Sequence, residues 1–227
     1  FASVSAGYYH TCGLRTDGSI VCWGDNSNEQ TDAPTGIEFA AVEVGYNHSC
    51  GLYLEGDDTK ITCWGASNQT ALYDDLKKFG LVKYIRDRHA QGLPIAGTSA
   101  GAAVMSAVMI PAMPKKPGLR ANNTPTTSGL GLAPGLIIDQ HFIARRRMNR
   151  LLSAVLDHPD KIGVGIGEAT AIIVRGKRFT VMGENSVIVI DPSAAKQTHP
   201  AKGKLQSATG LRLHVLKAGH EYLFGGK

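Results

Sequence analysis

The stretch that most constrains the fold is Leu93-Pro94-Ile95-Ala96-Gly97-Thr98-Ser99-Ala100-Gly101-Ala102. A short apolar run enters a Gly-x-Ser-x-Gly pattern, and an alanine-rich sequence of helical composition follows without a break. This order predicts a strand over 93–97, a sharp turn at Ser99 and a helix to about Ile110. At such a turn the serine hydroxyl is exposed, and the amide of Ala100 faces the place where an oxyanion forms. The alternative is a small-residue turn with no catalytic role.

Composition excludes some classes of protein. A chain of 227 residues can hold one large domain or two small ones, and 43% hydrophobic with 19% charged residues is typical of a globular protein. The net charge of +5 is spread over short basic runs, and no nucleic-acid-binding motif accompanies it, so we expect no nucleic-acid partner. No run of 18 apolar residues and no leader-like start is present, so we expect no membrane span.

Residues 1–65 contain an internal repeat with an offset of 38 residues, from Gly7 to Gly45. The run 7–14 returns as 45–52, with the shared pattern Gly-Tyr-x-His-x-Cys-Gly-Leu, and each copy closes on Cys-Trp-Gly. Alternating residues around an acidic-glycine turn predict a β-hairpin in each copy. Both copies resemble the repeats of the regulator-of-chromosome-condensation family, whose blades close a β-propeller. Two blades cannot close such a ring.

All four cysteines lie in these repeats, one pair in each copy: Cys12 with Cys22, and Cys50 with Cys63. Their positions favour a cross-strand disulfide in each hairpin and an oxidising compartment. Zinc bound by Cys12, Cys22, His10 and His48 is the alternative, ranked lower because no Cys-x-x-Cys pair is present. Because both histidines recur with the repeat, we expect them to make structural hydrogen bonds.

From Ala66 the pattern changes to alternating helices and strands. A helix is predicted over about 70–91, interrupted near Gly80, ahead of the 93–97 strand. The aperiodic segment 111–135, rich in Pro, Gly, Asn and Thr, is interpreted as a lid or substrate loop. Further strands are expected at 136–139, 162–166, 169–174, 179–181, 187–190 and 211–216, with a helix over about 143–157 and a polar loop over 192–210. This order predicts an α/β fold with a parallel sheet and covering helices.

Three predicted strand ends carry polar residues suited to catalysis: Ser99, His141 and Glu168. A serine hydroxyl needs an imidazole to accept its proton, and a carboxylate to hold that imidazole in one tautomer. Asp139 is the rival acid, but it lies only two residues from the histidine on a strand and is better placed to shape the pocket. The alternative is that His141 is a surface or capping residue and that Glu168 begins a loop.

Residues 66–227 resemble the serine peptidase family that includes cyanophycinase and aspartyl dipeptidase. The matching pieces are Gly97-Thr98-Ser99-Ala100-Gly101-Ala102, Asp139-Gln140-His141-Phe142 with the arginines that follow, and the run from Gly163 to Ala171. The resemblance implies a nucleophile at Ser99, a general base at His141 and an orienting acid at Glu168. It also implies that Gln69 contacts substrate, that Ala66 and Ala100 provide the oxyanion hole, and that no metal or other cofactor is used.

The family's reaction is hydrolysis of cyanophycin, a poly-aspartate backbone with arginine on each side chain, from its C-terminus to β-Asp-Arg dipeptides. Guanidinium groups bind carboxylates in a bidentate, planar way. We therefore expect Arg145, Arg147 and Arg150 to bind substrate carboxylates. Asp139 and Gln140 are the candidates for holding the backbone or the arginine of the substrate. A solvated basic helix face is the alternative for the arginines.

The chain also departs from the family pattern. Gly167 stands where an acidic residue commonly precedes the triad glutamate, and Gly65-Ala66 replaces the second glycine of the oxyanion loop. The repeats of 1–65 stand where the family has its first strand-helix units. We therefore expect two domains, 1–65 and 66–227, the second with a partial doubly wound, mostly parallel sheet of the class I glutamine amidotransferase type.

The predicted function is that of a serine exopeptidase of this family, with cyanophycin as its peptide substrate. The resemblance also implies a homodimer. The alternatives are an aspartyl dipeptidase and a non-catalytic binding protein that retains a decayed peptidase remnant. The paired cysteines favour an extracytoplasmic location, whereas the peptidase resemblance favours a cytoplasmic one.

Overall fold

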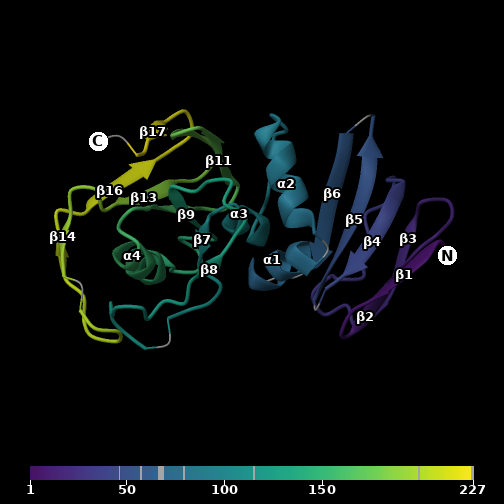
Figure 1. The fold of residues 1–227 in the computed structure, drawn as a ribbon, viewed down its shortest axis with the longest axis horizontal. Helices are drawn as coiled ribbons and strands as arrows, with labels where there is room; N and C mark the ends of the chain where they lie inside the picture. The colour runs from purple at the N-terminus through teal and green to yellow at the C-terminus, as the bar shows by residue number, and fades with distance from the viewer. Residues whose placement is uncertain are drawn as a thin grey trace. The chain divides into compact units, whose positions relative to one another are not determined.

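The computed structural model describes residues 1–45, 47–56, 58–65, 69–78, 80–114, 116–198 and 200–225. The chain divides into two compact units, Phe1–Asp75 and Leu76–Lys227 (Figure 1). Helix α1 (Gln69–Lys78) spans this division, and α2 (Leu81–Ala90) follows it. Gly80, with φ 71°, separates the two helices, as the sequence predicts. The domain boundary expected between residues 65 and 66 stays a prediction.

The first unit contains two three-stranded antiparallel sheets. One is β1 (Ser3–Ala6), β2 (His10–Leu14) and β3 (Ile20–Gly24); the other is β4 (Phe39–Val44), β5 (His48–Glu55) and β6 (Asp58–Gly65). The hairpins expected from the repeat are β2–β3 and β5–β6, and each has gained an outer strand that the sequence analysis did not predict. The two sheets share a core of Cys12, Leu14, Ile20, Phe39 and Val42.

The cysteines lie directly opposite each other in the hairpins. Cys12 pairs with Cys22 and Cys50 with Cys63 in the strand register, and each pair forms a disulfide. The predicted pairing is therefore confirmed, and these sulfur atoms are not thiolate ligands for zinc. His10 is 3% exposed, and its Nε2 lies 2.8 Å from Ser49 Oγ of the second repeat. A structural role for His10 is confirmed.

The second unit is organised around a four-stranded sheet in the order β16-β13-β10-β9. These strands are β9 (Leu136–Gln140), β10 (Ile162–Ile166), β13 (Val187–Asp191) and β16 (Arg212–Leu216). β9 and β10 are parallel and are joined through α4 (Met148–Asp157), whereas β13 pairs antiparallel with both of its neighbours. Parallel neighbours need such a crossover connection.

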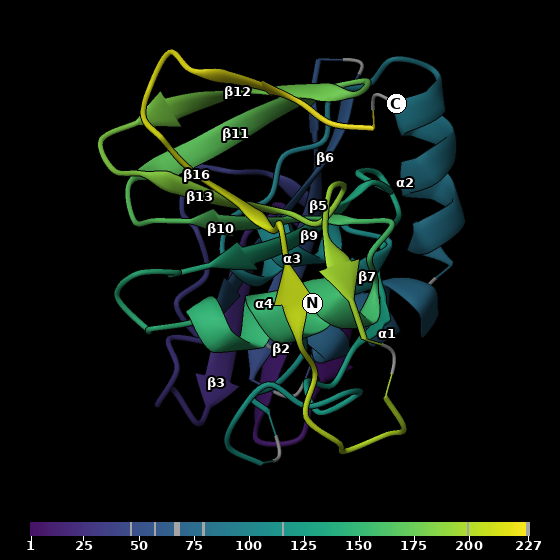
Figure 2. The same ribbon diagram turned by 90° about the vertical axis from the view of Figure 1, so that its left-hand side faces the viewer.

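Different layers cover the two faces of this sheet (Figure 2). On one face, α4 buries Leu151, Ala154 and Val155 against Ile137 and Ile188. On the other face lies a small antiparallel sheet of β11 (Thr170–Arg175), β12 (Arg178–Gly183) and β17 (Glu221–Leu223), which contributes Phe179 and Val181 to a second core. The unit therefore has a helix layer, a mixed sheet and a second sheet layer.

Glycines on β10 allow the first of these layers to approach closely. A Cβ atom at Gly163 would lie 2.6 Å from Val155 Cγ2, and one at Gly165 would lie within 2.6 Å of ring atoms of Phe142. Short pairs complete the unit: β7 (Val108–Met109) with β8 (Thr127–Ser128), and β14 (Lys196–Gln197) with β15 (Ala208–Thr209).

Several expectations differ from the structure. Residues 93–97 form no strand: Pro94 lacks an amide donor, and no neighbouring strand pairs with the segment in the part of the chain that the structure describes. The helix after Ser99 is only α3 (Ala100–Val104), because β7 begins at Val108. The helix expected from about 143 begins at Met148, since Arg146 adopts a left-handed φ of 51°. The strand order is mixed, so a mostly parallel, doubly wound sheet is not confirmed.

Candidate active site

Ser99 stands at a sharp turn immediately before α3. Its backbone has φ 50° and ψ −117°, a conformation that non-glycine residues rarely adopt and that costs about 1–3 kcal/mol. Gly97 has no room for a side chain, since a Cβ there would lie 2.7 Å from Met105 Cε and closer still to the Gly101 carbonyl. At Gly101, by contrast, a Cβ would meet no heavy atom within 4 Å among the described residues. The strained turn predicted from Gly-x-Ser-x-Gly is confirmed, with Gly97 as its essential glycine.

His141 and Glu168 are brought together by two adjacent strands. β9 and β10 are parallel, so their carboxyl ends lie at the same edge of the sheet. His141 directly follows β9, and Glu168 lies two residues beyond the end of β10. The turn between β9 and α4 begins at His141 and is called the histidine turn here. Phe142 anchors it, since this residue is 1% exposed and its amide donates to Ile166 O at 3.1 Å.

The three side chains form a continuous hydrogen-bonded chain. Ser99 Oγ lies 3.2 Å from His141 Nε2, and His141 Nδ1 lies 3.1 Å from Glu168 Oε1. The side chains of His141 and Glu168 are 33% and 45% exposed, so these hydrogen-bonded side chains lie at the surface of the second unit. The structure thus brings together the three residues that the sequence singled out as nucleophile, base and acid.

The arginines after His141 are arranged differently from the expected row of substrate contacts. Asp139 is 1% exposed, and it binds Arg150 through both carboxylate oxygens, with Nε 2.6 Å from Oδ2. Arg147 Nη1 lies 3.1 Å from Asp139 Oδ1, 2.6 Å from Gln140 O and 2.8 Å from Gln140 Oε1. Burial, together with the charge of Arg150, lowers the pKa of Arg147, and Asp139 opposes this shift. Asp139, Gln140, Arg147 and Arg150 therefore form a buried polar cluster beneath the histidine turn.

The remaining predicted residues have different positions. Arg145 is exposed, and its amide donates to His141 O at 2.9 Å, which keeps it on the histidine turn. Ala100 begins α3, so its amide belongs to the first turn, where N–H groups have no acceptor inside the helix. Gln69 begins α1, but its side chain lies outside the described part of the structure, as does the whole of Ala66.

Sequence reasoning missed two residues near the acid. Thr170 Oγ1 donates to Glu168 O at 3.0 Å, and Asn185 Nδ2 donates to the same oxygen at 2.8 Å. Thr170 lies within the run from Gly163 to Ala171, one of the pieces that carry the family resemblance. Asn185 lies in an ordinary polar turn between two strands and carried no signal that could have found it.

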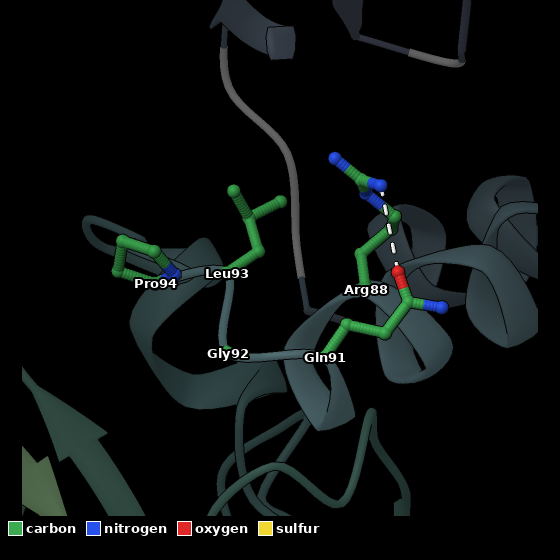
Figure 3. Close-up of a pocket in the computed structure, with 5 residues that line it drawn as sticks. All are labelled: Arg88, Gln91, Gly92, Leu93 and Pro94. Carbon is green, nitrogen blue, oxygen red and sulfur yellow. Dashed lines mark hydrogen bonds between the residues drawn. The ribbon is translucent and has the colours of Figure 1, made fainter.

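A hollow of about 280 Å³ lies at the end of α2, lined by Arg88, Gln91, Gly92, Leu93 and Pro94 (Figure 3). Arg88 Nη1 donates to Gln91 Oε1 at 3.5 Å across it. The hollow occupies the turn into the segment that leads to Ser99, and the predicted site residues do not line it. Among the described residues, no cluster of three or more His, Cys, Asp or Glu side chains could hold a metal ion.

A serine on a strained turn, hydrogen-bonded to a histidine that a carboxylate holds, is the arrangement of serine hydrolases. A model of peptidase family S51 matches residues 61–182, more than half of the chain. The chain therefore belongs to peptidase family S51. A model of the regulator of chromosome condensation (RCC1) repeat matches residues 1–30.

Relatives of this chain include cyanophycinases. The chain is 41% identical over 166 residues to one from Trichormus variabilis, an alignment covering 68% of this chain and 54% of that protein. It is 37% identical over 147 residues to one from Geminocystis herdmanii, covering 63% of this chain and 54% of the relative. The chain thus spans about half the length of these relatives. A solved receptor-kinase ectodomain from Arabidopsis thaliana is 42% identical over 28% of this chain and 22% of that chain, with a TM-score of 0.25.

No helix among the described residues has both the length and the apolar character needed to cross a membrane.

Proposed function

We propose that this chain is a serine-type exopeptidase that hydrolyses cyanophycin, multi-L-arginyl-poly-L-aspartate, to β-Asp-Arg dipeptides. The observation that carries the proposal is the Ser99–His141–Glu168 chain, with separations of 3.2 Å and 3.1 Å. The names of the relatives support the choice of substrate within the family.

In the first half of the reaction, His141 Nε2 accepts the hydroxyl proton of Ser99 while Oγ bonds to the carbonyl carbon of the substrate amide. Glu168 accepts a hydrogen bond from Nδ1–H, which fixes the tautomer in which Nε2 is free to act as a base, and stabilises the imidazolium that forms. The imidazolium then gives its proton to the leaving nitrogen as the carbon–nitrogen bond breaks. The product is an ester on Ser99 and a free amine.

In the second half, water attacks the ester carbonyl and gives a proton to His141 Nε2. The carbon–oxygen bond to Ser99 breaks, and the imidazolium returns the proton to Oγ. The negative charge on the carbonyl oxygen needs preorganised donors in both halves. We assign one of these to the amide of Ala100 and keep Ala66 as the second, which lies outside the described residues.

Substrate recognition depends on which arginine is exposed and can reach the substrate. Arg145 is exposed and held on the histidine turn, so it is the guanidinium we assign to an aspartyl carboxylate. The burial of Asp139, Gln140, Arg147 and Arg150 supports a different contribution, in which they hold that turn in place beneath the substrate. Gln69 remains a predicted substrate contact.

The finer expectations about fold and assembly belong to this proposal as well. A doubly wound sheet of the amidotransferase type finds support in the parallel β9–β10 pair with its crossover helix. The homodimer implied by the family resemblance is tested by light scattering of the purified chain. A molar mass near 24.1 kDa at micromolar concentration contradicts it.

The activity is tested by incubating the purified chain with cyanophycin and detecting β-Asp-Arg by mass spectrometry. Ser99→Ala is the matched control, since it removes one oxygen from an exposed position. Release by the wild-type chain and none by Ser99→Ala is the expected result. Cleavage of free aspartyl dipeptides without attack on the polymer favours the aspartyl dipeptidase alternative. No cleavage of either, together with no labelling of Ser99 by a fluorophosphonate, favours the binding protein.

A further inference from the structure

Glu168, the acid of the Ser99–His141–Glu168 triad, lies on a turn with a strained backbone. Glu168 is exposed, and its successor Ala169 has a φ of 49°, in the left-handed region. An L-residue in that region is disfavoured and persists only when its surroundings over-determine it. Because an exposed side chain has few packing contacts, the position of the Glu168 carboxylate depends on how firmly its backbone is held.

The segment between β12 and β13 supplies that support. Gly167 N donates to Ser186 O at 3.1 Å, and Glu184 N donates to Ala169 O at 2.9 Å. These two hydrogen bonds connect the residues on either side of Glu168 to residues 184–186. Gly183 makes the approach feasible, since a Cβ there would lie 2.7 Å from Thr170 Cα and closer still to Ala169 O.

Asn185 connects this segment to the acid itself. Its side-chain Nδ2 donates to Glu168 O at 2.8 Å, and its backbone amide donates to Thr170 Oγ1 at 2.8 Å. Thr170 Oγ1 in turn donates to Glu168 O at 3.0 Å, so the carbonyl of the acid accepts two hydrogen bonds. Asn185 therefore fixes the Glu168 peptide directly and also fixes the hydroxyl group that reinforces it.

We propose that Asn185 is a positioning residue that aims the Glu168 carboxylate at His141 Nδ1, acting through the Glu168 carbonyl and the Thr170 hydroxyl. Its catalytic consequence rests on the function proposed above. Asn185 donates to backbone and to Thr170, not to the reacting groups, so its loss weakens the His141–Glu168 contact without removing a substrate contact.

The experiment compares Asn185→Ala, Thr170→Val and the conservative Thr170→Ser with Asn149→Ala, which changes an exposed asparagine on α4. For cyanophycin hydrolysis, Asn185→Ala and Thr170→Val are expected to lower kcat about tenfold with KM unchanged, because the carboxylate is displaced and not removed. Thr170→Ser keeps the hydroxyl and should retain wild-type kcat, as should Asn149→Ala. An increase in KM at constant kcat overturns the proposal, because it marks a substrate contact.

A second readout needs no substrate. The ¹⁵N shifts of the His141 ring, assigned by their loss in His141→Ala, report which nitrogen carries the proton in the neutral form. Asn185→Ala should shift them from the Nδ1–H tautomer towards those of Glu168→Gln, and Asn149→Ala should not. If wild-type chain fails to release dipeptide, the proposed function fails, and the ring shifts still decide the role of Asn185. Ring shifts in Asn185→Ala identical to wild type overturn it.

Discussion

Arg150 binds Asp139 through two of its nitrogen atoms inside the second unit, with Nε 2.6 Å from Oδ2 and Nη2 bonded to Oδ1. The two residues are 4% and 1% exposed, and Asp139 precedes His141 by two positions. This pair holds the end of β9 to the start of α4. The basic run after the histidine therefore contains residues with separate tasks, which can be tested one at a time.

The buried pair predicts a large loss of stability in Arg150→Ala. Removing one partner leaves the Asp139 carboxylate buried with part of its charge uncompensated, which typically costs about 3–5 kcal/mol. The free energy of unfolding, from urea titration followed by far-ultraviolet circular dichroism, measures this. Asn149→Ala, one residue earlier on the exposed face of α4, is the control and should change it by less than about 0.5 kcal/mol. Equal midpoints for the two variants would contradict the role assigned to the pair.

We expect Arg145→Ala to behave in the opposite way, because it should weaken substrate binding and leave the stability of the protein unchanged. A charge-assisted hydrogen bond to a carboxylate contributes about 1.5–3 kcal/mol, so KM for cyanophycin should rise about 10- to 100-fold while kcat changes little. The exposed position implies a free energy of unfolding close to wild type. Arg146→Ala is the matched control, because Arg146 is also exposed and adjacent. A similar KM for both variants would mean that Arg145 does not select the substrate.

We expect Glu168→Gln to lower the rate of hydrolysis and to leave the fold intact. The amide keeps the size of the side chain but no longer stabilises the imidazolium, and it can stabilise the wrong imidazole tautomer, so kcat should fall about 10³–10⁴-fold. Its 45% exposed side chain predicts an unchanged thermal melt. Steady-state release of β-Asp-Arg measures the rate, and Glu184→Gln, on an exposed turn, is the control. Wild-type rates in Glu168→Gln would remove the acid from the mechanism.

Gly165→Ala tests the packing that supports the histidine turn. The new methyl group would overlap the ring of Phe142, which directly follows His141 and is 1% exposed. Overpacking of this kind typically costs about 1–3 kcal/mol. Gly101→Ala is the control for stability, because its Cβ would meet no heavy atom within 4 Å among the described residues. Urea midpoints that rank Gly165→Ala at or above Gly101→Ala would show that Phe142 has room to move.

The part of the site that local sequence determines could be predicted. The turn at Ser99 follows from Gly97, which leaves room for the helix, and His141 and Glu168 meet because each follows one of two adjacent strands. The partners of Arg147 and Arg150 could not be predicted, because spacing along the chain does not reveal that both guanidinium groups turn inwards to Asp139. Asn185 was missed for a related reason: its contacts join residues that are far apart in the sequence.

The fold was predictable to a similar degree. Apolar runs identified β9, β10 and β13, since these strands are buried whichever neighbours they have. The run at 93–97 is also largely apolar, yet Pro94 lacks an amide donor and no strand pairs with the run among the described residues. Nothing in the sequence pattern indicates that β11, β12 and β17 cover the face where helices are expected. Alternating patterns predict strands, but they do not predict which sheet a strand joins.

Acidification should destabilise the first unit through His10. Ser49 Oγ donates its proton to Gln30 O at 2.9 Å, so it accepts a hydrogen bond from His10 Nε2–H, and Nδ1 is buried without a hydrogen-bond partner among the described residues. A proton on Nδ1 would lack an acceptor there. Burial lowers the pKa of His10 below 6.5, with a smaller opposing effect from Asp25.

The sign of the effect follows from this direction. At pH values between the lowered folded-state pKa of His10 and the unfolded-state value of 6.5, the unfolded chain binds the proton more readily than the folded chain. The stabilisation is therefore complete above pH 6.5 and is lost as the pH falls from there through the folded-state pKa. Both tryptophans, Trp23 and Trp64, lie in the first unit, so urea unfolding followed by tryptophan fluorescence reports on it. The midpoint should fall from pH 7.5 to pH 5 in the wild-type chain and fall less in His10→Gln, which keeps a donor for Ser49 but does not titrate. The same pH dependence in both proteins would assign the acid sensitivity to other groups.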